Sequence, residues 1–219
     1  MVLKNLIVFE GIDGSGTTTQ LELLKAKCPA ITATAEPTAS AMGQFLRRML
    51  SAEVELSKQT AAYLFAADRC EHLFGKLCYH EGRLVTGVAE ACGKGSLVVS
   101  DRYLFSSLAY QGEATVRQLT ARLNEPFPLP EVLVYFAISP EAALERVASR
   151  GSKREIYETL STLKEVSRRY DEVLADYTLT PKADGMSVVK VDAALPVQDV
   201  AAAVWQVVSP FLLNTSSCS

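Results

Sequence analysis

The stretch Leu6-Ile-Val-Phe-Glu-Gly-Ile-Asp-Gly-Ser-Gly-Thr-Thr-Thr19 decides the fold, because an apolar run passes directly into a glycine-rich turn, and a helical pattern follows over 17–27. A strand, a glycine loop and a helix in this order predict a phosphate-binding loop, although a plain glycine turn is the alternative. Glycines let successive backbone N–H groups converge on phosphate oxygens, and the helix N-terminus adds its positive dipole end. We expect a phosphate loop over 11–18 and nucleotide-binding roles for Gly11, Gly14, Ser15, Gly16, Thr17, Thr18 and Thr19.

This loop departs from the pattern GxxxxGK[ST] at one position, where Thr17 replaces the lysine. A neutral hydroxyl cannot follow the charge that moves between phosphates, and a hydrogen bond to a charged group contributes about 1.5–3 kcal/mol. A nucleotide-dependent reaction therefore needs a cation from elsewhere in the chain. Thr18 keeps the hydroxyl that such loops offer to Mg²⁺.

Outside this loop, short apolar runs alternate with helical patterns, which is typical of an α/β fold with a parallel sheet buried on both faces. We expect five strands, at Leu6–Glu10, Ala30–Ala35, Leu97–Ser100, Val132–Ile138 and Ser187–Val191. We expect helices over 17–27, 40–50, 57–92, 105–123, 140–150, 159–176 and 197–209. We expect a stiff loop over Glu125–Pro130, before the fourth strand. We also expect Ser139 and Pro140 to begin a helix that ends at Gly151.

The composition describes one ordinary globular domain. The chain has 219 residues, 48 % of them apolar, and a net charge of −3, which argues against a sequence-independent nucleic-acid binder. Five cysteines without a CxxC pair are typical of reduced thiols in the cytoplasm. We expect neither a signal sequence nor a membrane span, because the apolar run at Leu6–Phe9 and the uncharged stretch after Asp199 are too short. We expect a single domain over 1–213, ending in an amphipathic helix, and a disordered tail over 214–219.

A basic segment supplies candidate cations for the loop. Seven of the 22 basic residues lie between 146 and 169, and Gly151-Ser152 interrupts them like a hinge. A basic segment on a hinge predicts a mobile lid, over about 148–160, that closes over an anionic substrate; a solvated, salt-bridged helix pair is the alternative. We expect Arg150, Lys153 and Arg154 to act in catalysis from this lid.

The sequence Ser100-Asp101-Arg102-Tyr103 follows the third expected strand, at the strand end where open α/β sheets bind ligands. Asp101 could hold the Mg²⁺ shell or orient Arg102, and Arg102 could clamp a phosphate. A simple ion pair at the strand end is the alternative.

Five ordered motifs resemble those of the thymidylate kinases, a branch of the P-loop nucleoside monophosphate kinases. The motifs are Phe9-Glu10-Gly11-Ile12-Asp13-Gly14-Ser15-Gly16; Glu36-Pro37 with Gly43 and Arg47; Leu64-Phe65-Ala66-Ala67-Asp68-Arg69; Asp101-Arg102-Tyr103 with Ser106 and Ala109-Tyr110-Gln111-Gly112; and the arginine-rich 146–158 stretch. The resemblance implies a three-layer α/β/α P-loop NTPase fold with a five-stranded parallel sheet. It also implies transfer of a phosphoryl group from Mg-ATP to dTMP.

The same resemblance assigns roles to single residues. Phe65 would stack on thymine and Arg69 would hydrogen-bond its exocyclic oxygen, while Arg47 and Arg102 would grip the dTMP phosphate. Asp13 would lie near the acceptor phosphate, the sugar or Mg²⁺, and Arg146 would approach the adenine of ATP. The remaining expected residues of the dTMP pocket are Glu36, Pro37, Ser106, Ser107, Tyr110 and Gln111, and those of the Mg²⁺ site are Thr18 and Asp101.

Several positions depart from the family pattern. Ala35 stands where the family pattern has an arginine before Glu36. Ala137 stands where the family often has an acid in the fourth strand, and Gly14 stands where some members carry an arginine in the loop. Two alternatives to a dTMP kinase stay open: a nucleotide-binding pseudokinase, and a kinase for another pyrimidine monophosphate such as dUMP. The resemblance also implies a homodimer, formed through the expected helices 57–92 and 105–123.

Overall fold

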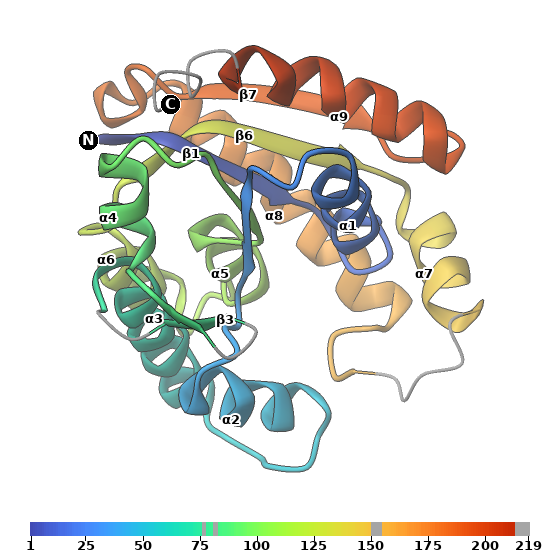
Figure 1. Ribbon diagram of the computed structural model, residues 1–219. Coiled ribbons are helices and arrows are strands. Elements are labelled where there is room, and N and C mark those ends of the chain that lie inside the picture. Colours follow the sequence, from blue (N-terminus) through green and yellow to red (C-terminus); the bar gives the residue numbers. More distant parts are fainter. Residues whose placement is uncertain (76–77, 81–82, 150–154, 213–219) are drawn as a thin grey trace.

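The computed structural model describes residues 1–75, 78–80, 83–149 and 155–212. Its centre is a sheet of five strands in the order β2-β5-β1-β6-β7, and every neighbouring pair is parallel (Figure 1). The bounds are β1 Val2–Glu10, β2 Thr32–Ala35, β5 Val98–Asp101, β6 Leu129–Ala137 and β7 Ser187–Asp192. The predicted five-stranded parallel sheet is therefore confirmed, with bounds that differ by a few residues.

Helices cover both faces of the sheet. Alternate residues of a strand point to opposite faces, so β1 contributes apolar side chains to a core on each side. Leu6 and Val8 belong to one apolar core, and Ile7 and Phe9 to the other. The first core is covered by α3 Lys58–Phe74, α4 Val88–Gly93, α5 Leu104–Tyr110 and α8 Leu160–Thr178, and the second by α1 Thr17–Lys27 and α9 Val197–Leu212. Figure 1 shows the red helix α9 on one side of the sheet and the green helices α3, α4 and α5 on the other.

Two local predictions about helices are confirmed. Val200, Val204 and Val208 of α9 are buried against the sheet, as the terminal amphipathic pattern predicts. Helix α7, Pro140–Ser149, begins where expected, and the Ser139 hydroxyl accepts a hydrogen bond from the Ala142 N–H at 3.3 Å. The remaining helices are α2 Ala41–Leu50 and α6 Arg117–Asn124, with a short 3₁₀ turn at Pro181–Ala183.

The prediction of one long helix over 57–92 is wrong. Helix α3 ends at Phe74, a hairpin of β3 Cys78–His80 and β4 Arg83–Val85 follows, and α4 begins only at Val88. Two glycines explain the interruption, because the backbones approach each other too closely for any side chain. A Cβ at Gly75 would lie 2.4 Å from the Glu71 carbonyl oxygen, and one at Gly87 would lie 2.5 Å from that of Leu73.

The helix expected over 105–123 is also divided, into α5 and α6. Helix α5 ends at Tyr110, and a Cβ at Gly112 would lie 2.5 Å from the Leu108 carbonyl oxygen. The loop expected over Glu125–Pro130 is shorter than predicted, since β6 starts at Leu129 and Pro130 pairs with Leu3 of β1. The helix end expected at Gly151 and the tail over 214–219 lie outside the described residues.

Within the described ranges, none of the helices is both long enough and apolar enough to cross a membrane.

Candidate active site

A pocket of about 290 Å³ opens at the carboxyl ends of β1, β2 and β5. Parallel sheets bring the ends of several strands to the same edge, so loops far apart in the sequence meet there. Its lining residues are Ile12, Asp13, Gly14, Gly16, Thr17, Thr18, Ala35, Glu36, Pro37, Arg47, Leu50, Phe65, Arg69, Asp101, Arg102, Tyr103, Ser106, Ser107, Tyr110, Gln111, Glu155, Tyr157 and Glu158.

The glycine loop between β1 and α1 has a backbone that only glycine adopts readily. Gly14 and Gly16 have φ values of 87° and 93°, in the left-handed region. A Cβ at Gly14 would also lie 2.3 Å from the carbonyl oxygen of Ala143 in α7. The loop of this chain therefore has no room for a side chain at position 14.

Thr18, the last residue of the expected loop and the second residue of α1, contacts the end of β5. Its hydroxyl donates a hydrogen bond to Asp101 Oδ2 at 2.5 Å, whereas Asp101 Oδ1 is buried and has no hydrogen-bond partner among the described residues. A buried carboxylate oxygen without a donor suits a hard cation, and Mg²⁺ in nucleotide sites is bound by one or two protein oxygens plus phosphates and water. Asp101 therefore accepts its side-chain hydrogen bond from Thr18. Of the two roles expected for Asp101, this geometry favours the Mg²⁺ shell over the orientation of Arg102.

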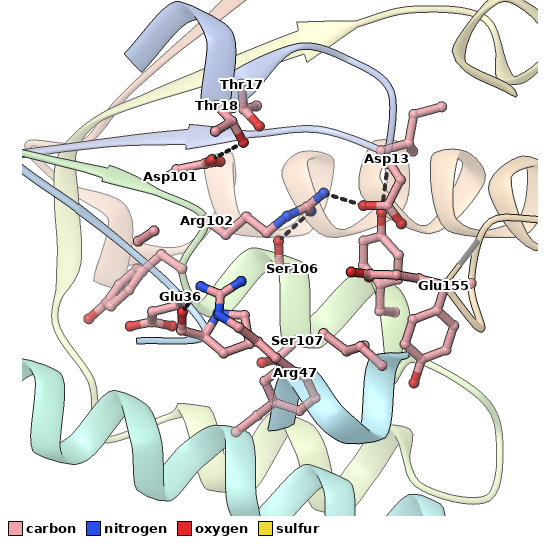
Figure 2. A pocket seen from close by; sticks show the side chains of 18 of the residues that line it. Asp13, Thr17, Thr18, Glu36, Arg47, Asp101, Arg102, Ser106, Ser107 and Glu155 are labelled. Atoms are coloured by element: carbon pink, nitrogen blue, oxygen red, sulfur yellow. Dashed lines mark hydrogen bonds and ion pairs between the residues drawn. The ribbon is translucent and has the colours of Figure 1, made fainter. Parts of the chain in front are cut away.

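Arg102 lies at the centre of the pocket wall and has an unusual backbone, with a φ of 73°. Figure 2 shows its guanidinium between Asp13 and Ser106. One nitrogen, Nη2, pairs with Asp13 Oδ1 at 2.5 Å, and Nη1 donates to the Gly11 carbonyl at 3.0 Å and to Ser106 Oγ at 3.1 Å. Burial acts to lower the Arg102 pKa, but nearby Tyr110 and Asp13 raise it well above its ordinary value. The side chain is 20 % exposed, so a fixed positive charge faces the pocket.

Helices α2 and α3 supply the wall opposite the glycine loop. Arg47 of α2 lines the pocket and donates a hydrogen bond to the Pro37 carbonyl, and Figure 2 shows its guanidinium pointing toward Arg102. Phe65 and Arg69 lie one turn apart on α3 and both line the pocket, as their spacing predicts.

Arg69 is held more tightly than its sequence motif indicates. Its side chain is 1 % exposed, and Nη2 contacts Glu36 Oε2 at 2.7 Å and donates to Ser107 Oγ at 3.1 Å. Nη1 donates to Asn124 Oδ1, a partner from α6 that the sequence did not identify, while Nε has no partner among the described residues. Arg69 is thus part of the fixed frame of the pocket.

Glu36 carries the negative charge of this frame. Burial acts to raise its pKa, but the Arg69 guanidinium and the His72 imidazole together lower it below its ordinary value. His72 Nδ1 lies 2.9 Å from Glu36 Oε1, and its Nε2 lies 2.7 Å from the Thr34 hydroxyl. Glu36 is therefore ionised and neutralised in place.

The segment after the basic cluster contributes three further lining residues: Glu155, Tyr157 and Glu158. The Ile156 N–H donates to the Leu50 carbonyl at 3.0 Å, and the rings of Tyr157 and Tyr110 lie 5.3 Å apart in an edge-to-face arrangement. Burial, together with the neighbouring charges of Asp13 and Glu158, raises the Glu155 pKa. The sequence analysis did not name these three residues as site residues, although they lie within the lid expected over about 148–160.

The pocket gathers most of the residues that the sequence singled out. Among the residues expected to bind the nucleotide, Gly11, Ser15, Thr19 and Arg146 do not line it. The three expected lid cations, Arg150, Lys153 and Arg154, lie outside the described residues.

Comparisons with known proteins agree with this geometry. The family model described as thymidylate kinase matches residues 9–204. The chain is 38 % identical over 195 residues to a putative thymidylate kinase of Treponema pallidum, covering 88 % of each chain. It is 33 % identical over 180 residues to a thymidylate kinase of Leptospira interrogans, covering 79 % of this chain and 83 % of the relative.

A solved structure, thymidylate kinase from Candida albicans, has the same fold. The TM-score is 0.72 at 23 % identity, with 97 % of this chain and 94 % of that chain covered. With the family model spanning most of the sequence, the conclusion is that this chain belongs to the thymidylate kinase family, whose members are nucleoside monophosphate kinases.

Proposed function

We propose that this protein transfers the γ-phosphoryl group of ATP to dTMP, giving ADP and dTDP, a step toward dTTP. The observation that carries the proposal is one pocket with two ends: a glycine loop and helix N-terminus at one, and Phe65, Arg69 and Gln111 at the other. Backbone N–H groups of such a loop bind phosphates, and an aromatic ring beside polar groups suits a base. Arg102 lies between the two ends, where the acceptor phosphate belongs.

Phosphoryl transfer of this kind requires alignment and charge neutralisation, with no covalent intermediate on the protein. The acceptor phosphate is already an anion at neutral pH, so a general base is not needed. Arg102 and Arg47 would bind this phosphate and offset its repulsion from the ATP phosphates. Asp13, paired with Arg102, would hold the guanidinium in the orientation that the phosphate meets.

Asp101 and Thr18 are the residues that would hold Mg²⁺, since the buried Asp101 Oδ1 has no donor among the described residues. When bound with ATP, the ion neutralises charge that develops between the β- and γ-phosphates.

Thr17 leaves the loop without its usual cation, and we propose that Arg150, Lys153 or Arg154 replaces it. In support, Gly14 cannot be exchanged for a loop arginine, and residues 155–158 continue from the basic cluster directly into the pocket wall. We expect Lys153→Ala or Arg154→Ala to lower kcat about 10-fold or more, because a lost charged hydrogen bond costs about 1.5–3 kcal/mol. The dissociation constant of dTMP should change less, and unchanged kcat in the double variant would contradict the replacement.

The acceptor is tested by competition. Coupled ADP-release assays with dTMP, dUMP and thymidine measure kcat/KM for each, and we expect dTMP to be preferred. One methyl group discriminates by only about 1–3 kcal/mol, so dUMP should react roughly 10- to 200-fold less efficiently. Thymidine lacks the phosphate that Arg102 and Arg47 would bind and should not react. Equal efficiency for thymidine and dTMP would overturn the assignment of the acceptor.

We also propose a homodimer through α3, and the cytoplasm as its compartment. Tyr63, Ala67, Cys70 and Phe74 are exposed along one stripe of α3 at helical spacing, and Tyr63 and Phe74 are 55 % and 56 % exposed. Cys28, Cys70 and Cys92 are free thiols, which suits a reducing compartment. Sedimentation equilibrium of the wild type and of Phe74→Glu tests the dimer: a monomeric wild type would contradict it.

A further inference from the structure

Glu10, the last residue of β1, is a wholly buried acid behind the pocket wall. It is 0 % exposed and does not line the pocket. Both carboxylate oxygens accept hydrogen bonds from the chain that follows β5, and Oε2 also accepts one from α8. Oε1 accepts from the Tyr103 N–H at 2.9 Å and the Ser106 N–H at 3.2 Å, and Oε2 accepts from the Ser106 hydroxyl at 2.6 Å and the Tyr170 hydroxyl at 2.9 Å.

Ser106 joins this acid to Arg102. Its hydroxyl donates to Glu10 Oε2 and accepts from Arg102 Nη1 at 3.1 Å. A hydroxyl has one proton to donate, and the shortest contact of Ser106 Oγ is the one to Glu10 Oε2, so an ionised Glu10 accepts this hydrogen bond and leaves the Ser106 lone pairs to Arg102. The guanidinium then continues to Asp13, which gives a chain of contacts from the buried acid to the pocket.

The backbone around Arg102 depends on the same acid. A φ of 73° is uncommon for a residue with a side chain, and neighbouring contacts must hold it there. The Arg102 N–H donates to the Phe9 carbonyl at 2.8 Å, Ser100 Oγ donates to the Arg102 carbonyl at 2.8 Å, and Glu10 binds the next N–H, that of Tyr103. The turn that directs Arg102 into the pocket is therefore anchored on both sides, and Glu10 is its buried anchor.

We propose that Glu10 is a positioning residue: as a carboxylate it fixes the turn from Arg102 to Ser106 and, through the Ser106 hydroxyl, aims the Arg102 guanidinium at the acceptor phosphate. This inference rests on the proposed function, in which Arg102 binds the phosphate of dTMP. In the wild type the Ser106 hydroxyl donates to Glu10. In Glu10→Gln an amide N–H₂ group can face this hydroxyl, which then no longer has an acceptor at position 10 to hold its proton away from Arg102. The guanidinium would lose its fixed orientation while the apolar core stays intact.

The experiment compares three single variants. Glu10→Gln removes the charge, Ser106→Ala removes the link, and Glu131→Gln is the matched control. Glu131 lies on β6 at the opposite end of the sheet, where it contacts Lys4 and the Asn5 N–H. Steady-state kinetics give kcat and KM for dTMP and for ATP, calorimetry gives the dTMP dissociation constant, and thermal unfolding monitors the folded state.

We expect kcat/KM for dTMP to fall roughly 10- to 100-fold in Glu10→Gln and in Ser106→Ala, the range that misplacing a substrate-binding group produces. The KM for ATP should stay within about twofold, and Glu131→Gln should match the wild type. Because both residues act through Arg102, the double variant should lose little more than either single variant. Unchanged dTMP kinetics in Glu10→Gln, or equal losses for dTMP and ATP, would overturn the proposal.

The pH profile supplies a readout that a purely structural role would not move. Burial raises the Glu10 pKa to about 7, although Ser106 and Arg102 act to lower it. The charged and titratable side chains that act on Glu10 are Arg102 from the β5–α5 turn, Tyr170 from α8 and Tyr135 from β6. Wild-type dTMP binding should weaken below about pH 7 more than binding by Glu10→Gln, and superimposable profiles would contradict the proposal.

Failure of the proposed function would look different. A wild type that binds dTMP but releases no ADP would overturn the kinase assignment, and calorimetry on the three variants would still test Glu10.

Discussion

Two buried glutamates at the ends of neighbouring strands bring arginines to the pocket in opposite ways. Glu36, just after β2, contacts Arg69 directly at 2.7 Å, and the two side chains are 4 % and 1 % exposed. Glu10, at the end of β1, reaches Arg102 only through the Ser106 hydroxyl, and Arg102 remains 20 % exposed. The charges of Glu36 and Arg69 neutralise each other inside the protein, whereas Arg102 and its partner Asp13 are both part-exposed at the pocket, where a ligand can reach the guanidinium.

The pKa values follow the same division. Burial acts to raise both, but direct contact with Arg69 and His72 lowers that of Glu36, while Glu10 rises to about 7. A direct buried ion pair fixes the arginine as part of the wall. An indirect link leaves Arg102 paired, among the described residues, only with Asp13, a residue that also lines the pocket, and Glu10 remains a poorly solvated carboxylate. Strongly perturbed acids of this kind cluster at functional sites.

The largest expected effect comes from breaking the direct pair. Glu36→Gln leaves Arg69 as a buried charge without its ion-pair partner, and breaking such a pair costs about 3–5 kcal/mol of unfolding free energy. Urea unfolding followed by circular dichroism measures this loss. The control is Glu90→Gln, because Glu90 is 49 % exposed and pairs only with Lys94 one turn away among the described residues; this variant should unfold within about 0.5 kcal/mol of the wild type. A loss below about 1 kcal/mol in Glu36→Gln would contradict the role of Glu36 as neutraliser.

The second prediction concerns the pH dependence of stability at Glu10. Its folded pKa of about 7 lies above the ordinary value of 4.5, so the folded state binds the proton more tightly than the unfolded state. The contribution of Glu10 to stability is therefore present below pH 4.5 and is lost as the pH rises through 7, by about 3 kcal/mol. Unfolding free energies of the wild type relative to Glu10→Gln should fall by this amount between pH 4.5 and 8. A constant difference would contradict the raised pKa.

The third prediction removes the available charge. Arg102→Met should lower kcat/KM for dTMP roughly 100-fold, the effect of losing a charged hydrogen bond to a phosphate, with a smaller change in KM for ATP. Arg168→Met is the control, since Arg168 pairs with Glu165 and Glu172 on the exposed side of α8. Parallel losses in both variants would indicate a general effect of charge instead of a specific contact.

The sequence predicted the sheet well because buried parallel strands are continuous apolar runs, as at Leu6–Glu10. It failed over 57–92 because helical spacing persists on both sides of Gly75 and Gly87, and only tertiary contacts show that the backbones meet there. The sequence did predict Gly14 as a loop residue. It did not predict that α7 approaches the loop so closely at Ala143 that a side chain at position 14 has no room.

The site could be predicted where residues lie next to each other in the sequence, as in Asp101 and Arg102, or one turn apart, as in Phe65 and Arg69. The partners could not, because Asp13–Arg102 and Asn124–Arg69 join residues that only the fold brings together. Glu10 shows this limit most clearly. In the sequence it is one letter of a motif, and its hydrogen bonds to Ser106 and Tyr170 depend on the packing of α5 and α8.

The central claim is that a glycine loop without its lysine still supports phosphoryl transfer to dTMP. Phosphorus NMR of the purified protein with Mg²⁺, ATP and dTMP follows all phosphate species at once. We expect dTDP and ADP to appear in equal amounts, and no ADP to form when dTMP is left out. ATP that stays intact in the presence of dTMP, or ADP that forms without dTDP, would contradict the account.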